Sequence, residues 1–153
     1  MINTKNVMTT ALHTIRAGKT MKEAYALMVE HKIRHLPVMN EQNFVVGMLS
    51  DRDMQLAMTA KKETAFHKSI SLDETLIVDD FMSWPVYVVA ENTSIRRVAE
   101  EMLAQKVSAF LIEDTKGKLK GIITTDDLLE LFVQGSPILP DTSINFFTKR
   151  LFK

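Results

Sequence analysis

The chain has 153 residues, of which 46% are hydrophobic and 25% charged, as expected for one folded domain or two small coupled ones. Its 19 Lys and Arg equal its 19 Asp and Glu, which argues against a nucleic-acid partner or an anionic-membrane surface, although a local basic patch would still be compatible. The absence of cysteine excludes disulfides, thiolate metal sites and a cysteine nucleophile.

The N-terminal residues, Met1 to Lys5, lack the basic segment and apolar run of a signal peptide. No apolar stretch of the chain approaches the ~18 residues needed to span a bilayer. We therefore expect a soluble cytoplasmic protein that has no membrane partner.

A first unit of predicted elements runs from about Val7 to Ala60. Thr20 precedes apolar residues at positions 21, 24, 25, 28 and 29, which is the spacing of an N-capped amphipathic helix. Residues 33–39 and 44–49 predict two strands joined by a polar turn. Residues 51–60 predict a second helix, with Ser50 as its N-cap.

The same pattern returns between about Phe81 and Gln134, after a polar connection at residues 61–76. Ser94 precedes the helix, residues 107–112 and 119–123 predict strands, and Thr124 precedes a helix over 126–132. One unit of about 50 residues buries too little apolar surface to be stable alone. We therefore expect an α/β (α+β) fold in which two strand-helix-strand-strand-helix units pack by pseudo-twofold symmetry. The residues expected to fill the core include Met28, Met102, Met48 and Ile122.

Each unit contains the motif Gly-x-x-Ser/Thr-x-x-Asp at a strand-to-helix turn, at residues 47–53 and 121–127. A carboxylate can accept hydrogen bonds from both hydroxyls of a ribose, and a hydroxyl beside the free N–H groups of a helix N-terminus suits a ribose or phosphate oxygen. The same residues could equally be plain N-caps and carboxylates that complement the helix dipole. The hydroxyl and carboxyl positions are Ser50, Asp53, Thr124 and Asp127.

With its apolar-Pro-Val strand at Ile33–Val38, this repeated motif resembles a tandem pair of CBS domains, or Bateman module, of the stand-alone bacterial type. The resemblance covers residues 7 to about 133, and the second unit departs from the first by having Leu111 in place of Pro37. We expect CBS repeat 1 over residues 1–65, a linker and CBS repeat 2 over 66–135, and a C-terminal tail over 136–153.

The resemblance implies a regulatory, non-catalytic homodimer that binds an adenine nucleotide (AMP, ADP, ATP or S-adenosylmethionine) between the repeats and acts on an unidentified protein partner. Each cleft would combine the Ser/Thr and Asp of one unit with a strand from the start of the other. Tyr87 or His13 would pack beside the adenine, or be half-buried strand residues. Carried over, Ser50 and Asp53 would face Pro85, Val86 and Tyr87, whereas Thr124 and Asp127 would face Ala11, Leu12 and His13.

The two units differ most in charge. An arginine can bind phosphate through two hydrogen bonds, and the resemblance places a basic phosphate ligand at residues 34–35. Surface arginines are the alternative interpretation, and the sequence leaves open which of the adjoining clefts the basic residues serve. These residues are Arg34, His35 and Arg52, and their counterparts are Ser108, Ala109 and Asp126.

No motif assembles a nucleophile, base and orienting group, so we expect no catalytic residues and no cofactor other than a regulatory nucleotide. His31 and His35 are four residues apart, but one ends a predicted helix and the other lies in a strand, so we expect no metal site. The alternative function is a structural or protein-interaction module without ligand binding that acts through dimerisation. The tail, with Phe146, Phe147 and Phe152, is expected to dock on the domain or mediate association.

Overall fold

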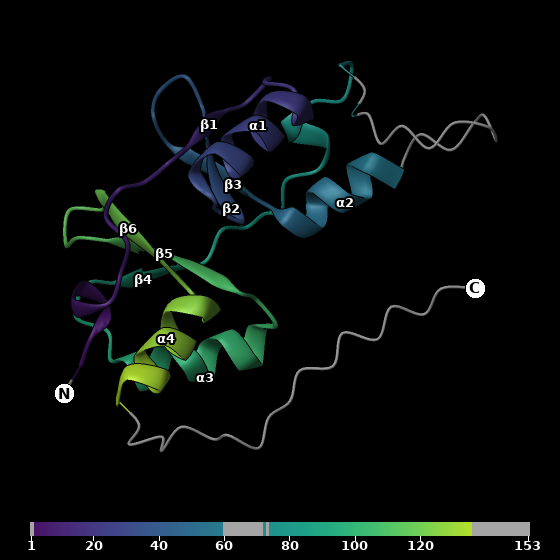
Figure 1. The fold of residues 1–153 in the computed structure, drawn as a ribbon. Coiled ribbons are helices and arrows are strands. Elements are labelled where there is room, and N and C mark those ends of the chain that lie inside the picture. The colour runs from purple at the N-terminus through teal and green to yellow at the C-terminus, as the bar shows by residue number, and fades with distance from the viewer. Residues whose placement is uncertain (1, 60–71, 73, 136–153) are drawn as a thin grey trace, which may run out of the picture.

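The computed structural model describes residues 2–59, 72 and 74–135 (Figure 1). The first unit contains β1 (Ile15–Arg16), α1 (Met21–His31), β2 (His35–Met39), β3 (Val45–Ser50) and α2 (Asp51–Thr59). The second contains β4 (Val88–Ala90), α3 (Ile95–Gln105), β5 (Ala109–Glu113), β6 (Leu119–Thr124) and α4 (Thr125–Gly135). A short 3-10 helix precedes each unit, η1 (Thr4–Asn6) and η2 (Val78–Asp80). The order of elements confirms the prediction, whereas the predicted tail lies outside the described residues.

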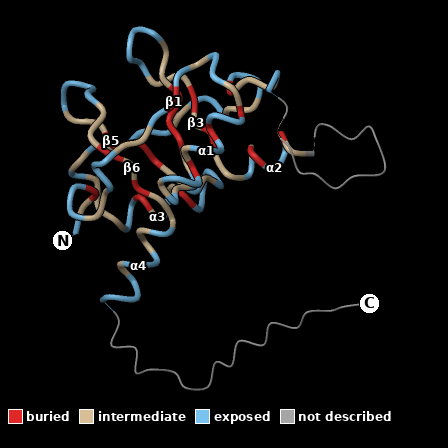
Figure 2. The backbone as a smooth tube through the Cα atoms, turned by 45° about the horizontal axis from the view of Figure 1, so that its top comes forward, coloured by how far each residue is buried: buried red, intermediate tan, exposed pale blue. Residues whose placement is uncertain are grey.

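Each unit folds around a three-stranded sheet. The strand orders are β1-β2-β3 and β4-β5-β6, with the first pair parallel and the second antiparallel in both sheets. The paired strands carry most of the buried residues in Figure 2, whereas α4 has none. No helix among the described residues is long and apolar enough to cross a bilayer.

Helices α1 and α3 begin where the sequence predicts. The Thr20 side chain accepts a hydrogen bond from the backbone N–H of Glu23, and the Ser94 side chain accepts one from Arg97, so both residues are N-caps. Lys32 and Lys106 end α1 and α3 in the left-handed conformation, with φ of 54° and 58°. These turns direct the chain into β2 and β5, next to the clefts described below.

The segment that leads into each unit packs on the other unit. Thr9 exchanges two backbone hydrogen bonds with Ile122 in β6 (2.9 and 3.0 Å), and Ser83 does the same with Met48 in β3 (2.8 and 3.0 Å). Figure 1 shows the N-terminal segment starting beside the second unit and continuing to β1 in the first. The two units therefore complete each other, as expected for units too small to be stable alone.

The packing of each lead segment against the other unit explains why the repeated motif begins with glycine. A Cβ on Gly121 would lie 2.8 Å from the carbonyl oxygen of Thr9, and one on Gly47 would lie 2.4 Å from Met82 Sδ. The glycines therefore let the lead segments lie directly against β6 and β3.

The predicted strands at Ala11–His13 and Pro85–Tyr87 were wrong, because both segments lie just before a strand. In the second unit the Leu111 N–H donates to the Tyr87 carbonyl (3.0 Å), and β4 starts directly afterwards. The equivalent residue in the first unit is Pro37, which has no N–H to donate. This accounts for β1 having two residues and β4 three.

The core forms two clusters, one per unit. Met28 and Met102 are buried as predicted, at 6% and 4% exposure. The prediction that Met48 and Ile122 fill the core was wrong: both are only partly buried and line the clefts, because the lead segment of the other unit pairs with their backbone.

Candidate ligand-binding clefts

The two motif turns have the same local geometry. In the first, the backbone N–H and the Oγ of Ser50 both donate to Asp53 Oδ2 (2.7 Å each), and the Asp53 N–H donates to Ser50 Oγ (3.3 Å). In the second, Thr124 N and Oγ1 donate to Asp127 Oδ2 (2.6 and 2.8 Å). Ser50 and Thr124 are thus N-caps. Within the described residues, however, Oδ1 of each carboxylate accepts no hydrogen bond and is available to a ligand.

Cleft A is a cavity of about 300 Å³ between the second unit's motif and the start of the first unit. Its lining includes Asp127 and Thr124 together with the segment Ala11–Leu12–His13. The structure thus brings together all five residues that were expected to share a cleft. The other lining residues are Thr9, Lys32, Ile33, Arg34, His35, Pro37, Ile122 and Asp126.

Cleft B is the pseudo-twofold counterpart, with a volume of about 130 Å³. It brings Ser50 and Asp53 together with Pro85–Val86–Tyr87, again the expected grouping. The Tyr87 ring stands edge-on to Phe110 with a centroid distance of 5.8 Å, which fixes one wall. The remaining lining residues are His35, Met48, Ser83, Lys106, Val107, Ser108 and Ala109.

The predicted basic residues are distributed unequally. Arg34 lines cleft A together with Lys32, whereas Arg52 lines neither cleft. Arg52 instead borders a polar hollow of about 360 Å³, which Arg34 and Asp51 also line. This hollow lies near the pseudo-twofold axis. The structure therefore assigns Arg34 to cleft A and separates Arg52 from both motif carboxylates.

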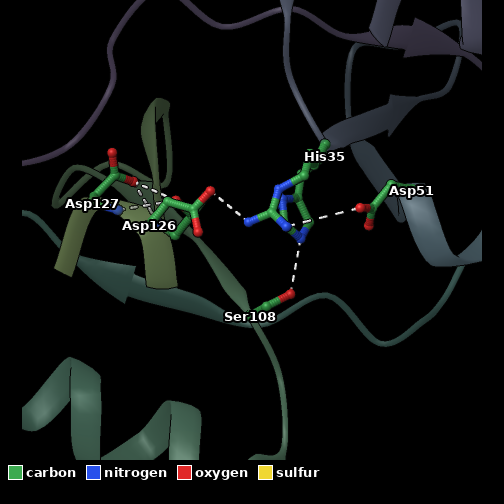
Figure 3. Close-up of polar contacts among 7 residues, drawn as sticks. His35, Asp51, Ser108, Asp126 and Asp127 are labelled. Carbon is green, nitrogen blue, oxygen red and sulfur yellow. Dashed lines mark hydrogen bonds and ion pairs between the residues drawn. The ribbon is translucent and has the colours of Figure 1, made fainter. Parts of the chain in front are cut away.

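His35 lies between the clefts and lines both of them. Its Nε2 is 2.9 Å from Ser108 Oγ, across the unit boundary. Figure 3 shows Asp126 and Asp51 on opposite sides of His35. Burial lowers the pKa of His35 below its usual 6.5, and the Asp51 carboxylate only partly opposes this effect.

Each cleft also contains a lysine that the sequence did not lead us to predict. Lys32 and Lys106 occupy equivalent C-cap positions and line clefts A and B respectively. Their identity across the repeat was the available signal, because a left-handed C-cap favours glycine over lysine. The described residues contain no cluster of three or more His, Cys, Asp or Glu side chains that could hold a metal ion.

The chain belongs to the CBS domain family, because the family model matches residues 5–59 and again residues 78–134. It is 30% identical over 128 residues to the CBS domain-containing protein YhcV of Bacillus subtilis, covering 84% of each chain. It is 29% identical over 141 residues to the chloroplastic CBS domain-containing protein CBSX1 of Arabidopsis thaliana, covering 80% of this chain and 60% of that one. Relatives named as enzymes are longer: the L-aspartate semialdehyde sulfurtransferase of Methanocaldococcus jannaschii is matched over only 23% of its length.

Solved CBS domain pairs have the same fold. The pair of protein MJ0100, solved with 5′-methylthioadenosine and S-adenosyl-L-methionine, superposes with a TM-score of 0.74 at 23% identity, covering 89% of this chain and 99% of that one. CBSX2 in complex with AMP gives a TM-score of 0.66 at 24% identity, covering 88% and 98%. These likenesses confirm the fold class of two CBS repeats.

Proposed function

We propose that this protein is a regulatory module that binds an adenine nucleotide, with cleft A as its principal site. The observation that carries the proposal is that one cavity joins an Asp127 carboxylate with an open oxygen, a backbone segment from the other unit and two cations, Lys32 and Arg34. Its volume of about 300 Å³ is at the lower end of the roughly 300–1,000 Å³ range of small-molecule sites.

Each part of an adenosine nucleotide has a chemical counterpart in cleft A. Asp127 Oδ1 would accept from the ribose hydroxyls, as acidic residues do in dinucleotide folds. The backbone of residues 11–13 would read the adenine edge. Pro37 has no N–H, and the described residues donate no hydrogen bond to the His13 carbonyl, so this carbonyl would accept from the adenine amino group.

Cleft B would be a second, weaker site. It has the same hydroxyl–carboxylate turn, but its volume of about 130 Å³ requires the walls to open around a nucleoside. MJ0100 with S-adenosyl-L-methionine and CBSX2 with AMP support an adenine-containing ligand for this fold. We also propose that the module acts in the cytoplasm on a protein partner and performs no catalysis itself.

The first experiment is thermal unfolding with adenosine, AMP, ATP and S-adenosylmethionine, with GTP as the base-specificity control. A ligand at 100 times its Kd stabilises the native state by about 2.7 kcal/mol. For a chain of this size the midpoint should then rise by several degrees. An adenine-selective rise supports the proposal, and the absence of a rise with every adenine compound overturns it.

Asp127→Ala and Asp53→Ala form a matched pair that tests the assignment of the principal site. Hydrogen bonds to a charged group contribute about 1.5–3 kcal/mol, so loss of the Asp127 carboxylate should weaken adenosine binding roughly tenfold or more. Asp53→Ala removes the same type of turn from cleft B and should leave the tighter binding event nearly unchanged in calorimetry. The reverse ranking would make cleft B the principal site.

A second candidate function, an interaction module that acts as a homodimer, is favoured by an apolar surface on the second unit's helices. Leu103 of α3 and three residues of α4, Leu129, Phe132 and Val133, are each more than 60% exposed. Light scattering of the wild type and Phe132→Glu tests this candidate. A dimer that the substitution disrupts, combined with no binding of any adenine compound, would favour the interaction module.

A further inference from the structure

Arg34, a cation of cleft A, is already bound by a carboxylate from the other unit. Its Nη2 donates to Asp126 Oδ2 at 2.5 Å, and its Nη1 lies 3.9 Å from Asp51 Oδ2. The side chains of Arg34 and Asp126 are 52% and 60% exposed, and both line cleft A. The shorter of these two contacts therefore joins Arg34 to a carboxylate that also lines cleft A.

This arrangement matters for any ligand with an anionic group. Lys32 and Arg34 are the cations among the residues lining cleft A, and Asp126 and Asp127 are its anions. A phosphate that bound Arg34 would have to displace the Asp126 carboxylate or share the guanidinium with it. In either case, two like charges would lie close together, which opposes binding.

We propose that Asp126 is a specificity-determining residue, an internal competitor that occupies Arg34 and lowers the affinity of cleft A for phosphorylated nucleosides relative to unphosphorylated ones. The inference rests on the proposed nucleotide site and names its preference. Cleft A then selects adenine nucleosides whose 5′ substituent is neutral or positively charged, and it binds 5′-phosphates only at a cost.

Comparison of the two units indicates that the Arg34–Asp126 ion pair belongs to cleft A. The position equivalent to Arg34 is Ser108, and the position equivalent to Asp126 is Arg52. Cleft B therefore has no arginine–carboxylate pair at the corresponding place, and its lining contains one lysine, Lys106. A change at Asp126 should alter phosphate recognition in cleft A and leave cleft B unaffected.

The test is calorimetry of adenosine and AMP with the wild type, Asp126→Asn, Asp51→Asn and Arg34→Gln. The ratio of AMP to adenosine affinity isolates the phosphate contribution from recognition of the nucleoside. Exposed ion pairs contribute about 0.2–1 kcal/mol, and relief of repulsion adds to this, so Asp126→Asn should raise the ratio about three- to tenfold. The gain should shrink at 1 M salt, because the Debye length falls to about 3 Å.

Asp51→Asn is the matched control, because it removes a carboxylate on the other side of Arg34 that does not line cleft A. It should change the ratio less than about twofold. In the Arg34→Gln background, Asp126→Asn should give no gain, since the cation for which phosphate and carboxylate compete is absent.

An unchanged ratio in Asp126→Asn would overturn the inference, as would a gain that persists without Arg34. Adenosine binding by the wild type with either of these results would leave the proposed function standing. If the wild type binds neither adenosine nor AMP, the proposed function fails and the inference fails with it.

Discussion

Cleft A and cleft B are formed by equivalent elements of the two units, and comparing them separates what builds a cleft from what tunes it. Both have the hydroxyl–carboxylate turn, the glycine under the crossing lead segment and a lysine at the helix C-cap. They differ in volume, about 300 against 130 Å³, and in the Arg34–Asp126 pair. The backbone scaffold is thus duplicated, whereas charge and width have diverged.

The largest expected effect on stability concerns Gly47 and Gly121 of the repeated motif. These two glycines are equivalent in sequence but contact different atoms of the other unit. In Gly121→Ala the new Cβ would meet the Thr9 carbonyl, which is fixed by hydrogen bonds to Ile122. In Gly47→Ala it would meet the flexible side chain of Met82. Overpacking costs typically 1–3 kcal/mol, so Gly121→Ala should lose about 3 kcal/mol and Gly47→Ala about 1.

Urea unfolding of both glycine variants measures this difference, with equal m-values as the check that the denatured states are comparable. Equal losses would show that the lead segment adapts as easily at β6 as at β3. A larger loss for Gly47→Ala would mean that the Met82 side chain cannot move aside.

The second expected effect on stability concerns the central strands β2 and β5. At equivalent positions, β2 has Pro37 and β5 has Leu111. Leu111→Pro removes the N–H that binds the Tyr87 carbonyl and also removes a side chain that is fully buried. A proline in a central strand loses a ladder hydrogen bond, so we expect a loss of about 2–3 kcal/mol. Pro37→Leu restores an N–H in the other unit but also enlarges a fully buried side chain, so overpacking should cost it about 1–3 kcal/mol.

Thermal unfolding of the two strand variants, followed by amide exchange around residues 87–90, distinguishes the effects. Faster exchange in Leu111→Pro would show that β4 has shortened to the length of β1. Unchanged exchange would mean that the proline does not account for the difference between the two strands.

The sequence predicted the repeated fold well because the signals were local and present twice. The caps Thr20 and Ser94, the apolar spacing and the motif turns each specify their own element. The extended segments before β1 and β4 were assigned wrongly as strands. The difference in length between β1 and β4 could not be predicted either, since it depends on whether residue 37 or 111, distant in the chain, has an N–H to donate.

The residues of each cleft could be grouped from the resemblance, but their charge relations could not. The Arg34–Asp126 pair joins residues 92 positions apart, and its existence depends on how the two units face each other. The widths of the clefts likewise depend on that packing. Periodicity and spacing report on single elements and contain no information about such contacts between units.

The third prediction tests whether a positive charge like that of Arg34 in cleft A would improve phosphate binding in cleft B. Ser108→Arg places a guanidinium at the position equivalent to Arg34, where Arg52 replaces the competing carboxylate. AMP affinity of cleft B should rise about three- to tenfold. Trp84, the only tryptophan of the chain and 77% exposed, precedes Pro85 of cleft B, so its fluorescence is the readout.

Ser108→Ala is the control, because it removes the same hydrogen bond to His35 without adding charge. If both variants change AMP binding alike, the effect comes from the lost hydrogen bond, and charge would not be what distinguishes the clefts.

The smallest expected effect is the pH response of His35, which belongs to both clefts. Burial lowers its pKa in the folded state, whereas in the unfolded chain it has the usual value of 6.5. As pH falls through 6.5, the unfolded state therefore binds a proton that the folded state resists, and stability decreases until the folded pKa is reached. Above pH 7 the contribution vanishes, because both states are neutral.

Melting curves of the wild type and His35→Gln between pH 7.5 and 5.5 measure this response. The midpoint of the wild type should fall more than that of the variant over that range. His31→Gln, which removes an imidazole that stacks on His13 and lies outside the His35–Ser108 contact, is the control for the loss of a histidine elsewhere. Parallel curves for wild type and His35→Gln would show that the boundary between the clefts accepts a charged imidazole, with Asp51 and Asp126 compensating for burial.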